Sequence, residues 1–426
     1  MRRSLATIVV LMSLAIGISG TAYGACANAS GIFSLNVTIA NSDLEECGVF
    51  GTNTAETFLD KFKQSGLSSI AGITYSGTEI TSISAVFNSL PIQLAFPNQG
   101  ATGSGALLTF NIAALGISQT FNGATRDASQ SLLVDYLKKS GVIGQIMKYQ
   151  AQNSPFSPIA GPGGTIPTMV SGSFNENFND TATNIAGPAD AAAAAKLNGY
   201  TPNLISASTV YSSLNVKDEQ VNFFALPLSY TIRNDIDPRR QLVISVPLAV
   251  TDTGGAKSYS GGLGVSYRFP INDAWTITPG VKAAVSGSKD LATLAGVYSA
   301  FLTSTYIWSM DNYDVAMGNM VGYVKTMKLS VGDYSADPGI NSTVFRNGLL
   351  FSQPVSLSGK KLSLEFSIID TRYTGGSFYV DNTQEFGIAL GTNKHAYSAR
   401  SFFRVGLSYL HGKDTNGVTG NLGFWF

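Results

Sequence analysis

Apolar and polar residues alternate along most of the second half of the chain. From residue 206 onward, segments of about ten residues or more carry apolar side chains at every second position, and short polar stretches separate them. Because successive side chains of a strand point to opposite faces of a sheet, this pattern predicts strands with one apolar and one polar face. We expect twelve strands, at residues 206–216, 221–233, 241–251, 258–269, 274–286, 294–309, 313–327, 343–357, 360–373, 378–392, 399–410 and 417–426.

These segments are long enough for tilted strands to cross a bilayer, which takes about 9 to 11 residues. The clearest hairpin turns at residues 270–273. Tyr267 and Phe269 precede this turn on the apolar face and Trp275 follows it, so we expect the three rings to form an aromatic girdle at a membrane interface. In a soluble β-sandwich the same rings would belong to the core.

Several charged residues fall on the polar face of the expected strands. In a closed barrel this face lines the lumen. The residues are Arg268, Lys282, Arg346, Glu365, Glu385 and Arg404. Two interpretations stay open: the charges form an electrostatic filter in a water-filled pore, or they pair across a narrow interior and hold it shut.

The first half of the chain follows other periods. Residues 54–64 and 127–149 carry apolar side chains at helical spacing, whereas residues 80–96 and 107–121 alternate like strands. Together they predict a small α+β domain over residues 25–152, with the helical faces serving as ordinary core.

Residues 153–205 have the composition of a linker. Pro155, Pro158, Pro162 and Pro167 stand among glycines, and an alanine-rich run at residues 191–196 favours a short helix. That helix could be a surface connector, or it could plug the lumen.

The first 24 residues predict a secretory signal peptide. Arg2 and Arg3 precede an apolar run, and Ala22-Tyr23-Gly24 follows it. No later apolar stretch reaches the ~18 residues of a membrane helix. Export to an oxidising compartment predicts a disulfide between Cys26 and Cys47, with lipid modification of Cys26 as the alternative.

Charge and motifs exclude several classes of function. The chain has 27 basic and 27 acidic residues, and charged residues make up 13% of it, about half the ~25% of globular domains. Nucleic acid is therefore not an expected partner. The only histidines are His395 and His411, and neither a zinc-protease motif nor a nucleophile elbow occurs. We expect no catalysis, metal or cofactor, although a lipase triad using His411 remains an alternative.

The C-terminal half of the chain resembles Gram-negative outer-membrane β-barrel proteins. The resemblance rests on Leu422-Gly423-Phe424-Trp425-Phe426 and on the alternation of Phe403, Val405, Leu407 and Tyr409 before it. It implies that outer-membrane lipid surrounds the barrel. It also implies that the barrel-assembly machinery recognises the terminal strand through Leu422, Phe424, Trp425 and Phe426.

Twelve strands behind an exported domain resemble the translocator of an autotransporter. The N-terminal domain is short for that class, and it shows neither β-helical repeats nor an Asn-Asn cleavage pair. The resulting hypotheses are a pore, a translocator and anchor for the N-terminal domain, or a surface adhesin on a plugged barrel. A porin predicts a periplasmic domain and an open lumen, whereas a translocator predicts a domain outside the cell, tethered through the lumen. Long connections mark the outer side of such barrels, so the stretch 328–342 is expected outside.

Overall fold

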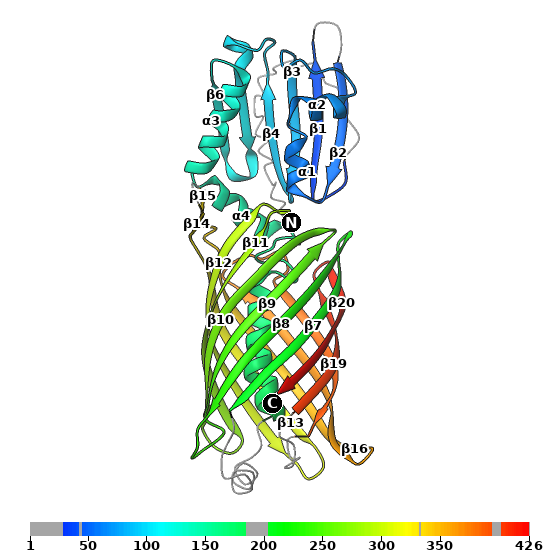
Figure 1. Cartoon of the computed structure of the whole chain (residues 1–426), viewed down its shortest axis with the longest axis vertical. Helices are drawn as coiled ribbons and strands as arrows, with labels where there is room; N and C mark the ends of the chain where they lie inside the picture. The colour runs from blue at the N-terminus through cyan, green and yellow to red at the C-terminus, as the bar shows by residue number, and fades with distance from the viewer. Residues whose placement is uncertain (1–28, 42–44, 185–202, 332–333, 394–401, 426) are drawn as a thin grey trace, which may run out of the picture.

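The computed structural model describes residues 29–41, 45–184, 203–331, 334–393 and 402–425. An N-terminal α+β domain stands on one end of a C-terminal antiparallel β-barrel (Figure 1). The predicted fold class is thereby confirmed. Several predicted features lie outside the described residues, namely the signal peptide, Cys26, the alanine-rich run 191–196, His395 and Phe426.

The barrel consists of twelve strands in one closed sheet, as the alternating pattern predicts. Its last strand pairs with its first, with Trp425 opposite Ser206 and Thr415 opposite Val216. The strands are β7 (Leu204–Val216), β8 (Glu219–Arg233), β9 (Gln241–Thr253), β10 (Ala256–Pro270), β11 (Trp275–Ser288), β12 (Thr293–Ser309), β13 (Asp314–Met327), β16 (Asn341–Leu357), β17 (Lys360–Thr374), β18 (Asn382–Thr392), β19 (Phe402–Gly412) and β20 (Thr415–Trp425). A small hairpin, β14 (Leu329–Val331) and β15 (Tyr334–Ala336), follows β13.

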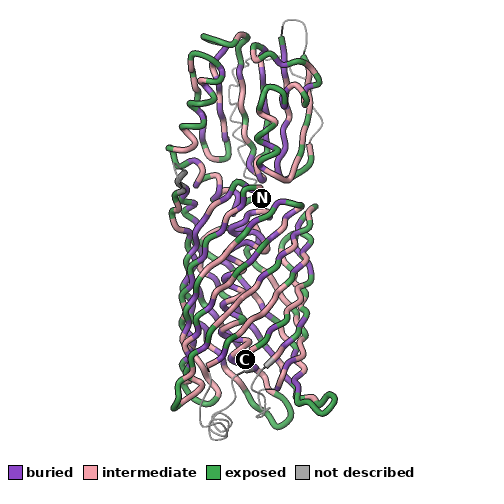
Figure 2. The backbone as a smooth tube through the Cα atoms, in the orientation of Figure 1, coloured by how far each residue is buried: buried purple, intermediate pink, exposed green. Residues whose placement is uncertain are grey.

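The outer face of the barrel wall exposes apolar side chains and the inner face holds polar ones, as expected for a barrel in a membrane. On β11, Val281 is 59% exposed while its neighbour Lys282 is 8% exposed. Buried and exposed positions alternate along the barrel strands in the same way (Figure 2). Large apolar side chains are exposed on the outside all around the wall. Examples are Leu263, Leu302, Leu349, Ile368 and Leu407. A water-soluble sandwich would bury these side chains, so the outer face is suited to lipid.

The N-terminal domain is built on a six-stranded antiparallel sheet. Neighbours follow the order β2-β1-β3-β4-β5-β6, which makes most of the sheet a meander. The strands are β1 (Phe33–Ala40), β2 (Glu45–Thr52), β3 (Ile80–Phe87), β4 (Leu90–Phe96), β5 (Leu107–Ile112) and β6 (Ile117–Asn122). The helices are α1 (Ala55–Asp60), α2 (Gln64–Ala71), α3 (Arg126–Lys139) and α4 (Val142–Asn153), and η1 (Gly103–Ala106) and η2 (Ala113–Leu115) are single 3-10 turns.

The prediction of one continuous helix over residues 127–149 was wrong. The segment forms two helices, because Gly141 adopts a left-handed conformation with φ of 74° and ends the first helix. The helix expected at residues 54–64 is likewise shorter, because α1 ends at Asp60 and a turn at residues 61–63 precedes α2. The apolar periodicity persists across both breaks, which is why the sequence alone did not separate the helices.

The domain contacts the hairpin turns at one end of the barrel through direct hydrogen bonds. The backbone N–H of Ala55 donates to the carbonyl oxygen of Asp290 at 2.6 Å. The amide of Asn53 donates to the carbonyl oxygen of Gly254 at 2.9 Å. Ala256 and Leu291 of the barrel are fully buried against the domain's own core. These contacts seat the domain over the mouth of the barrel (Figure 1).

The barrel's own chain ends lie at the other mouth. The first residues of β7 pair with the last residues of β20 there, while the turns 217–218 and 413–414 between those strands and their partners lie beside the domain. The connection from residue 328 to residue 340 also lies on the domain side, where α3 contacts β15. The chain must therefore pass from one mouth to the other between the domain and β7.

Candidate functional site

A helical segment crosses this distance inside the barrel. It comprises α5 (Thr165–Phe174), a π-helical turn η3 (Asn175–Asn179) and α6 (Asp180–Asn184), and it lies within the lumen (Figure 1). Pro167 stands in the first turn, where a missing N–H costs no hydrogen bond. The interpretation of residues 153–205 as a linker was therefore incomplete, because their central part forms a buried helix.

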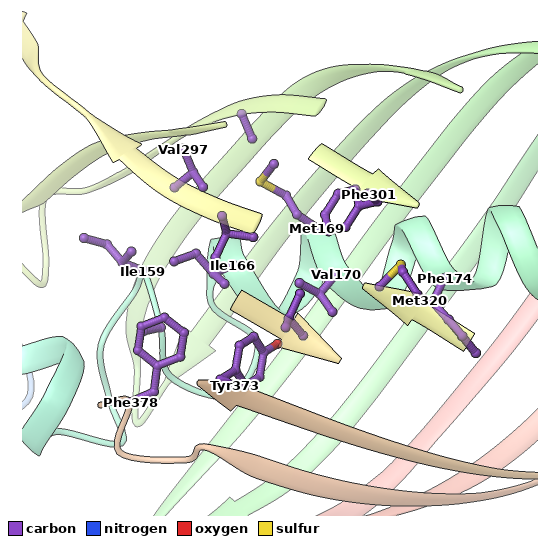
Figure 3. Packing of buried hydrophobic residues seen from close by; sticks show 14 of the residues in the cluster. Ile159, Ile166, Met169, Val170, Phe174, Val297, Phe301, Met320, Tyr373 and Phe378 are labelled. Carbon is purple, nitrogen blue, oxygen red and sulfur yellow. The ribbon is translucent and has the colours of Figure 1, made fainter. Parts of the chain in front are cut away.

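One side of the lumen helix is apolar and packs against the barrel wall. Ile166, Met169, Val170 and Phe174 recur at helical spacing and are almost completely buried. They join inward-facing apolar side chains of the wall in one cluster, shown in Figure 3. The wall residues labelled there are Val297, Phe301, Met320 and Tyr373, together with Phe378 of the β17–β18 connection.

Two glycines of the wall make room for the rings of the helix. Gly318 and Gly348 lie opposite each other on β13 and β16. A Cβ atom at Gly318 would collide with the ring of Phe178, and one at Gly348 would lie 3.0 Å from the ring of Phe174. The two rings also contact each other, with centroids 5.0 Å apart. Glycine at both wall positions therefore creates the flat surface on which the helix rests.

The other side of the lumen helix is acidic and meets basic residues of the wall. The carboxylate of Glu176 accepts from Lys282 Nζ at 3.0 Å and from Ser266 Oγ at 3.0 Å. Both charged side chains are largely buried, with 7% of Lys282 and 12% of Glu176 exposed. The guanidinium of Arg268 donates to the main-chain oxygen of Glu176 and lies 3.9 Å from the carboxylate of Asp180. Arg268 thus contacts the lumen helix at its π-helical turn, to which Glu176 belongs.

The remaining charges of the lumen pair with one another along the wall. Arg404 binds Glu365 through two nitrogens, at 2.9 and 3.2 Å. Arg346 binds Glu385 at 2.9 Å and lies over the ring of Phe174, 5.2 Å from its centroid. Wall carboxylates thus neutralise Arg346 and Arg404, while the lumen helix supplies carboxylates to Lys282 and Arg268.

The structure places all six charged residues singled out in the sequence inside the barrel. Arg268, Lys282, Arg346, Glu365 and Arg404 are buried, and 18% of the Glu385 side chain is exposed. Of the two interpretations, these contacts fit a closed lumen with paired charges rather than an open filter. The sequence analysis did not identify Glu176 or Asp180. Their signal was a spacing of four residues on the polar side of an apolar stripe.

Aromatic rings gather on the outer wall at the mouth remote from the domain. The rings of Tyr267 and Phe269 contact each other at a tilt of 50°, with centroids 4.3 Å apart. Trp275 begins β11 next to them and donates its indole N–H to Ser304 at 2.9 Å. The sequence analysis missed further rings at the same end, among them the pair Tyr306 and Trp308. This position suits the interfacial belt of a membrane barrel.

The last strand of the barrel carries apolar residues outward. Leu422 and Phe424 are exposed on the outside of β20, and Trp425 closes the strand. The ring of Trp425 lies 5.8 Å from the guanidinium of Arg404. Recognition of these side chains by the assembly machinery stays a prediction.

Cys47 and His411 are the remaining sequence candidates within the described part of the chain. Cys47 is part of a disulfide, and its predicted pairing with Cys26 stays a prediction. His411 is exposed on β19, where Gln384 and Asn416 lie opposite it. Among the described residues, no group of histidine, cysteine and carboxylate side chains could hold a metal ion. In the same part of the chain, no helix has both the length and the apolar character to cross a membrane.

Comparison with known proteins finds likeness in the barrel. No family model and no curated protein matches the sequence. The solved beta domain of the Bordetella autotransporter Brka is 12% identical, with 53% of this chain and 99% of that chain covered and a TM-score of 0.41. The translocator domain of autotransporter NalP from Neisseria meningitidis is also 12% identical, with coverages of 61% and 97% and a TM-score of 0.42. The KdgM porin is 10% identical, with coverages of 52% and 98% and a TM-score of 0.31. The chain thus combines an N-terminal α+β domain with a closed twelve-stranded antiparallel barrel that resembles autotransporter translocators and outer-membrane porins.

Proposed function

We propose that this protein is an outer-membrane anchor that holds its N-terminal domain on the outside of the cell. The observation that carries the proposal is the path of the chain. The domain lies at one mouth of the barrel, the helical segment 165–184 runs through the lumen, and β7 begins at the opposite mouth. A protein that presents a domain through its own barrel requires this path.

The side of the membrane follows from the expected route of export. A signal peptide over residues 1–24 would deliver the chain to the periplasm, and a barrel with an even number of strands has both of its chain ends on one side. If those ends face the periplasm, the domain lies outside. The connection 328–340 supports this orientation, since it is on the domain side and long connections are typical of the outer surface.

A passive pore is the competing function. The helical segment inside the lumen argues against it, because it would obstruct the passage of solutes. The helix occupies the space along β11, β12 and β13, and its charges are paired with the wall. A porin with a periplasmic domain would also require the domain and the barrel's chain ends at the same mouth. We therefore assign the barrel the role of anchor, with export of the domain as the step that its lumen serves.

Protease treatment of intact cells tests the proposal. Fractionation first establishes that the protein is in the outer membrane. Trypsin added to whole cells should then remove the domain at its exposed lysines, such as Lys63 and Lys139, and leave the barrel intact. Protection of the domain in intact cells, with cleavage after the outer membrane is opened, would contradict the proposal. Planar-bilayer recording of the full chain completes the test, because steady conductance of porin size would favour a pore.

A further inference from the structure

The sheet of the N-terminal domain is covered by helices on one face only. Leu35, Ile83, Leu94 and Phe110 point to that face and pack below the helices. Figure 1 shows α1 and α2 in front of β1 and β2 on this side. The alternate residues of the same strands form a second face, which no described helix covers.

On five of the six strands the uncovered face is an array of hydroxyl and amide groups in register, broken by Ala95, while Val49 and Cys47 stand beside the two rows on the edge strand β2. One row runs across five paired strands, and a second row lies two residues further along them. The first row is Asn36, Ser84, Gln93, Asn111 and Ser118, and the second is Thr38, Ser82, Ala95, Thr109 and Thr120. Neighbouring groups in a row stand about 4.8 Å apart and the rows about 6.8 Å apart, from the dimensions of a sheet.

The polar groups of this array are available to a ligand. Ser82, Ser84, Gln93, Ser118 and Thr120 are exposed. Among the described residues, the hydroxyl of Thr109 donates to the carbonyl oxygen of Ala95, and the other side chains of the two rows bond to no protein group. The array therefore carries many free donors and acceptors on a flat surface.

Charge is sparse around this array. In the six strands the only charged residues are Glu45 and Glu46 of the edge strand β2, and Glu45 pairs with Ala40, one row beyond Thr38. Most exposed charges of the domain lie on the helices, for example Glu56, Asp60 and Lys139. A polyanion such as nucleic acid requires lysine and arginine at its contacts, and protein interfaces concentrate aromatic residues and arginine. Neither kind of residue occurs in the two rows.

We propose that the uncovered sheet face, defined by these two rows, binds an uncharged polysaccharide. Sugar hydroxyls match the hydroxyl and amide groups of the face, and a polymer presents them at regular intervals, as the face does. The absence of charge fits a neutral ligand, since any buried unpaired charge would be costly. The proposal rests on the proposed function insofar as the domain meets the polymer outside the cell, and it makes that domain an adhesin for neutral glycans.

The test is retention of the purified full chain, in detergent, on insoluble polysaccharides. Neutral cellulose and cross-linked dextran are compared with anionic heparin-agarose and cationic chitosan. We expect retention on at least one neutral polymer and none on the charged ones. Gln93→Lys places a charge in the centre of the face and should weaken retention at least about tenfold, because the charge would lose its water on binding.

Gln130→Lys is the matched control, since it is the same substitution at an exposed position of α3 on the helical side. It should leave retention unchanged. Equal loss in both variants, or no retention of the wild-type chain on any neutral polymer, would overturn the proposal. A dimer that Gln93→Lys dissociates would overturn it too, in favour of a second copy as the occupant.

Whole cells separate this inference from the function on which it rests. If the purified chain binds a neutral polymer and cells that display it bind as well, both stand. If the purified chain binds and the cells do not, the sheet face keeps its ligand and the surface position of the domain is contradicted. If the domain is accessible on cells but neither form binds, the inference fails and the anchor function remains.

Discussion

Replacing Lys282 by methionine isolates the ion pair between the lumen helix and the wall. At an effective dielectric of about 20, unit charges 3.0 Å apart attract by about 5 to 6 kcal/mol. Desolvation offsets much of this for the intact pair, but the single substitution leaves Glu176 buried without its partner. Such losses cost about 3 to 5 kcal/mol. Arg268 compensates little, because Gln241 and Asp180 already engage it.

The assay is denaturant unfolding in liposomes, followed by the tryptophan fluorescence of the barrel. Lys282→Met should lower the free energy of unfolding by about 3 kcal/mol or more, whereas the double variant with Glu176→Gln should recover much of the loss. The control is Lys257→Met, at an exposed lysine of β10, with an expected change within about 0.5 kcal/mol. Strictly additive losses in the double variant would refute the pairing.

Three further predictions concern the wall, its outer face and the domain. Gly318→Ala should cost about 1 to 3 kcal/mol by overpacking against Phe178, and the same change should cost almost nothing in a Phe178→Ala background. A cost unaffected by that background would show that the contact is absent. Val281→Arg, at a position 59% exposed on the outer face, should cost about 2 to 4 kcal/mol in lipid if it lies near the midplane; an unaffected barrel would contradict the lipid-facing register. Burial alone would raise the pKa of Glu79, but hydrogen bonds from Ser76 and from backbone N–H groups hold it below its usual value. The stability that this carboxylate provides is therefore present above the unfolded-state pKa and is lost as the pH falls through the folded one. Hydrogen exchange of the sheet should show Glu79→Gln as destabilising at neutral pH, and the difference from wild type should shrink as the pH falls below the usual range of a glutamate pKa. A difference that stays constant as the pH falls would contradict the prediction.

The strands were predictable because each obeys one local rule. Every second residue of a barrel strand meets lipid, so pairs such as Val281 and Lys282 record the face to which each belongs. The same rule gave the charged residues that the structure places in the lumen. These features depend on the sequence of one strand and on the existence of a closed sheet.

The lumen helix was missed for a physical reason. Its apolar stripe, from Ile166 to Phe174, is short, and the prolines and glycines before it are equally typical of a linker. Its polar residues find partners only in distant strands, as Glu176 does in Lys282, and such pairings leave no trace in local periodicity. The position of the domain on the barrel is likewise set by single contacts, such as that of Asn53 with Gly254. No pattern along the sequence predicts such contacts.

The most direct test of the account is labelling of single introduced cysteines on intact cells with a membrane-impermeant maleimide. Lys139→Cys lies on α3 of the domain, and Asp235→Cys lies in an exposed turn at the opposite mouth of the barrel. The account predicts that the cysteine at position 139 is labelled on intact cells and that the one at position 235 is labelled only after the outer membrane is permeabilised. Labelling in the reverse order would place the domain in the periplasm and contradict the account.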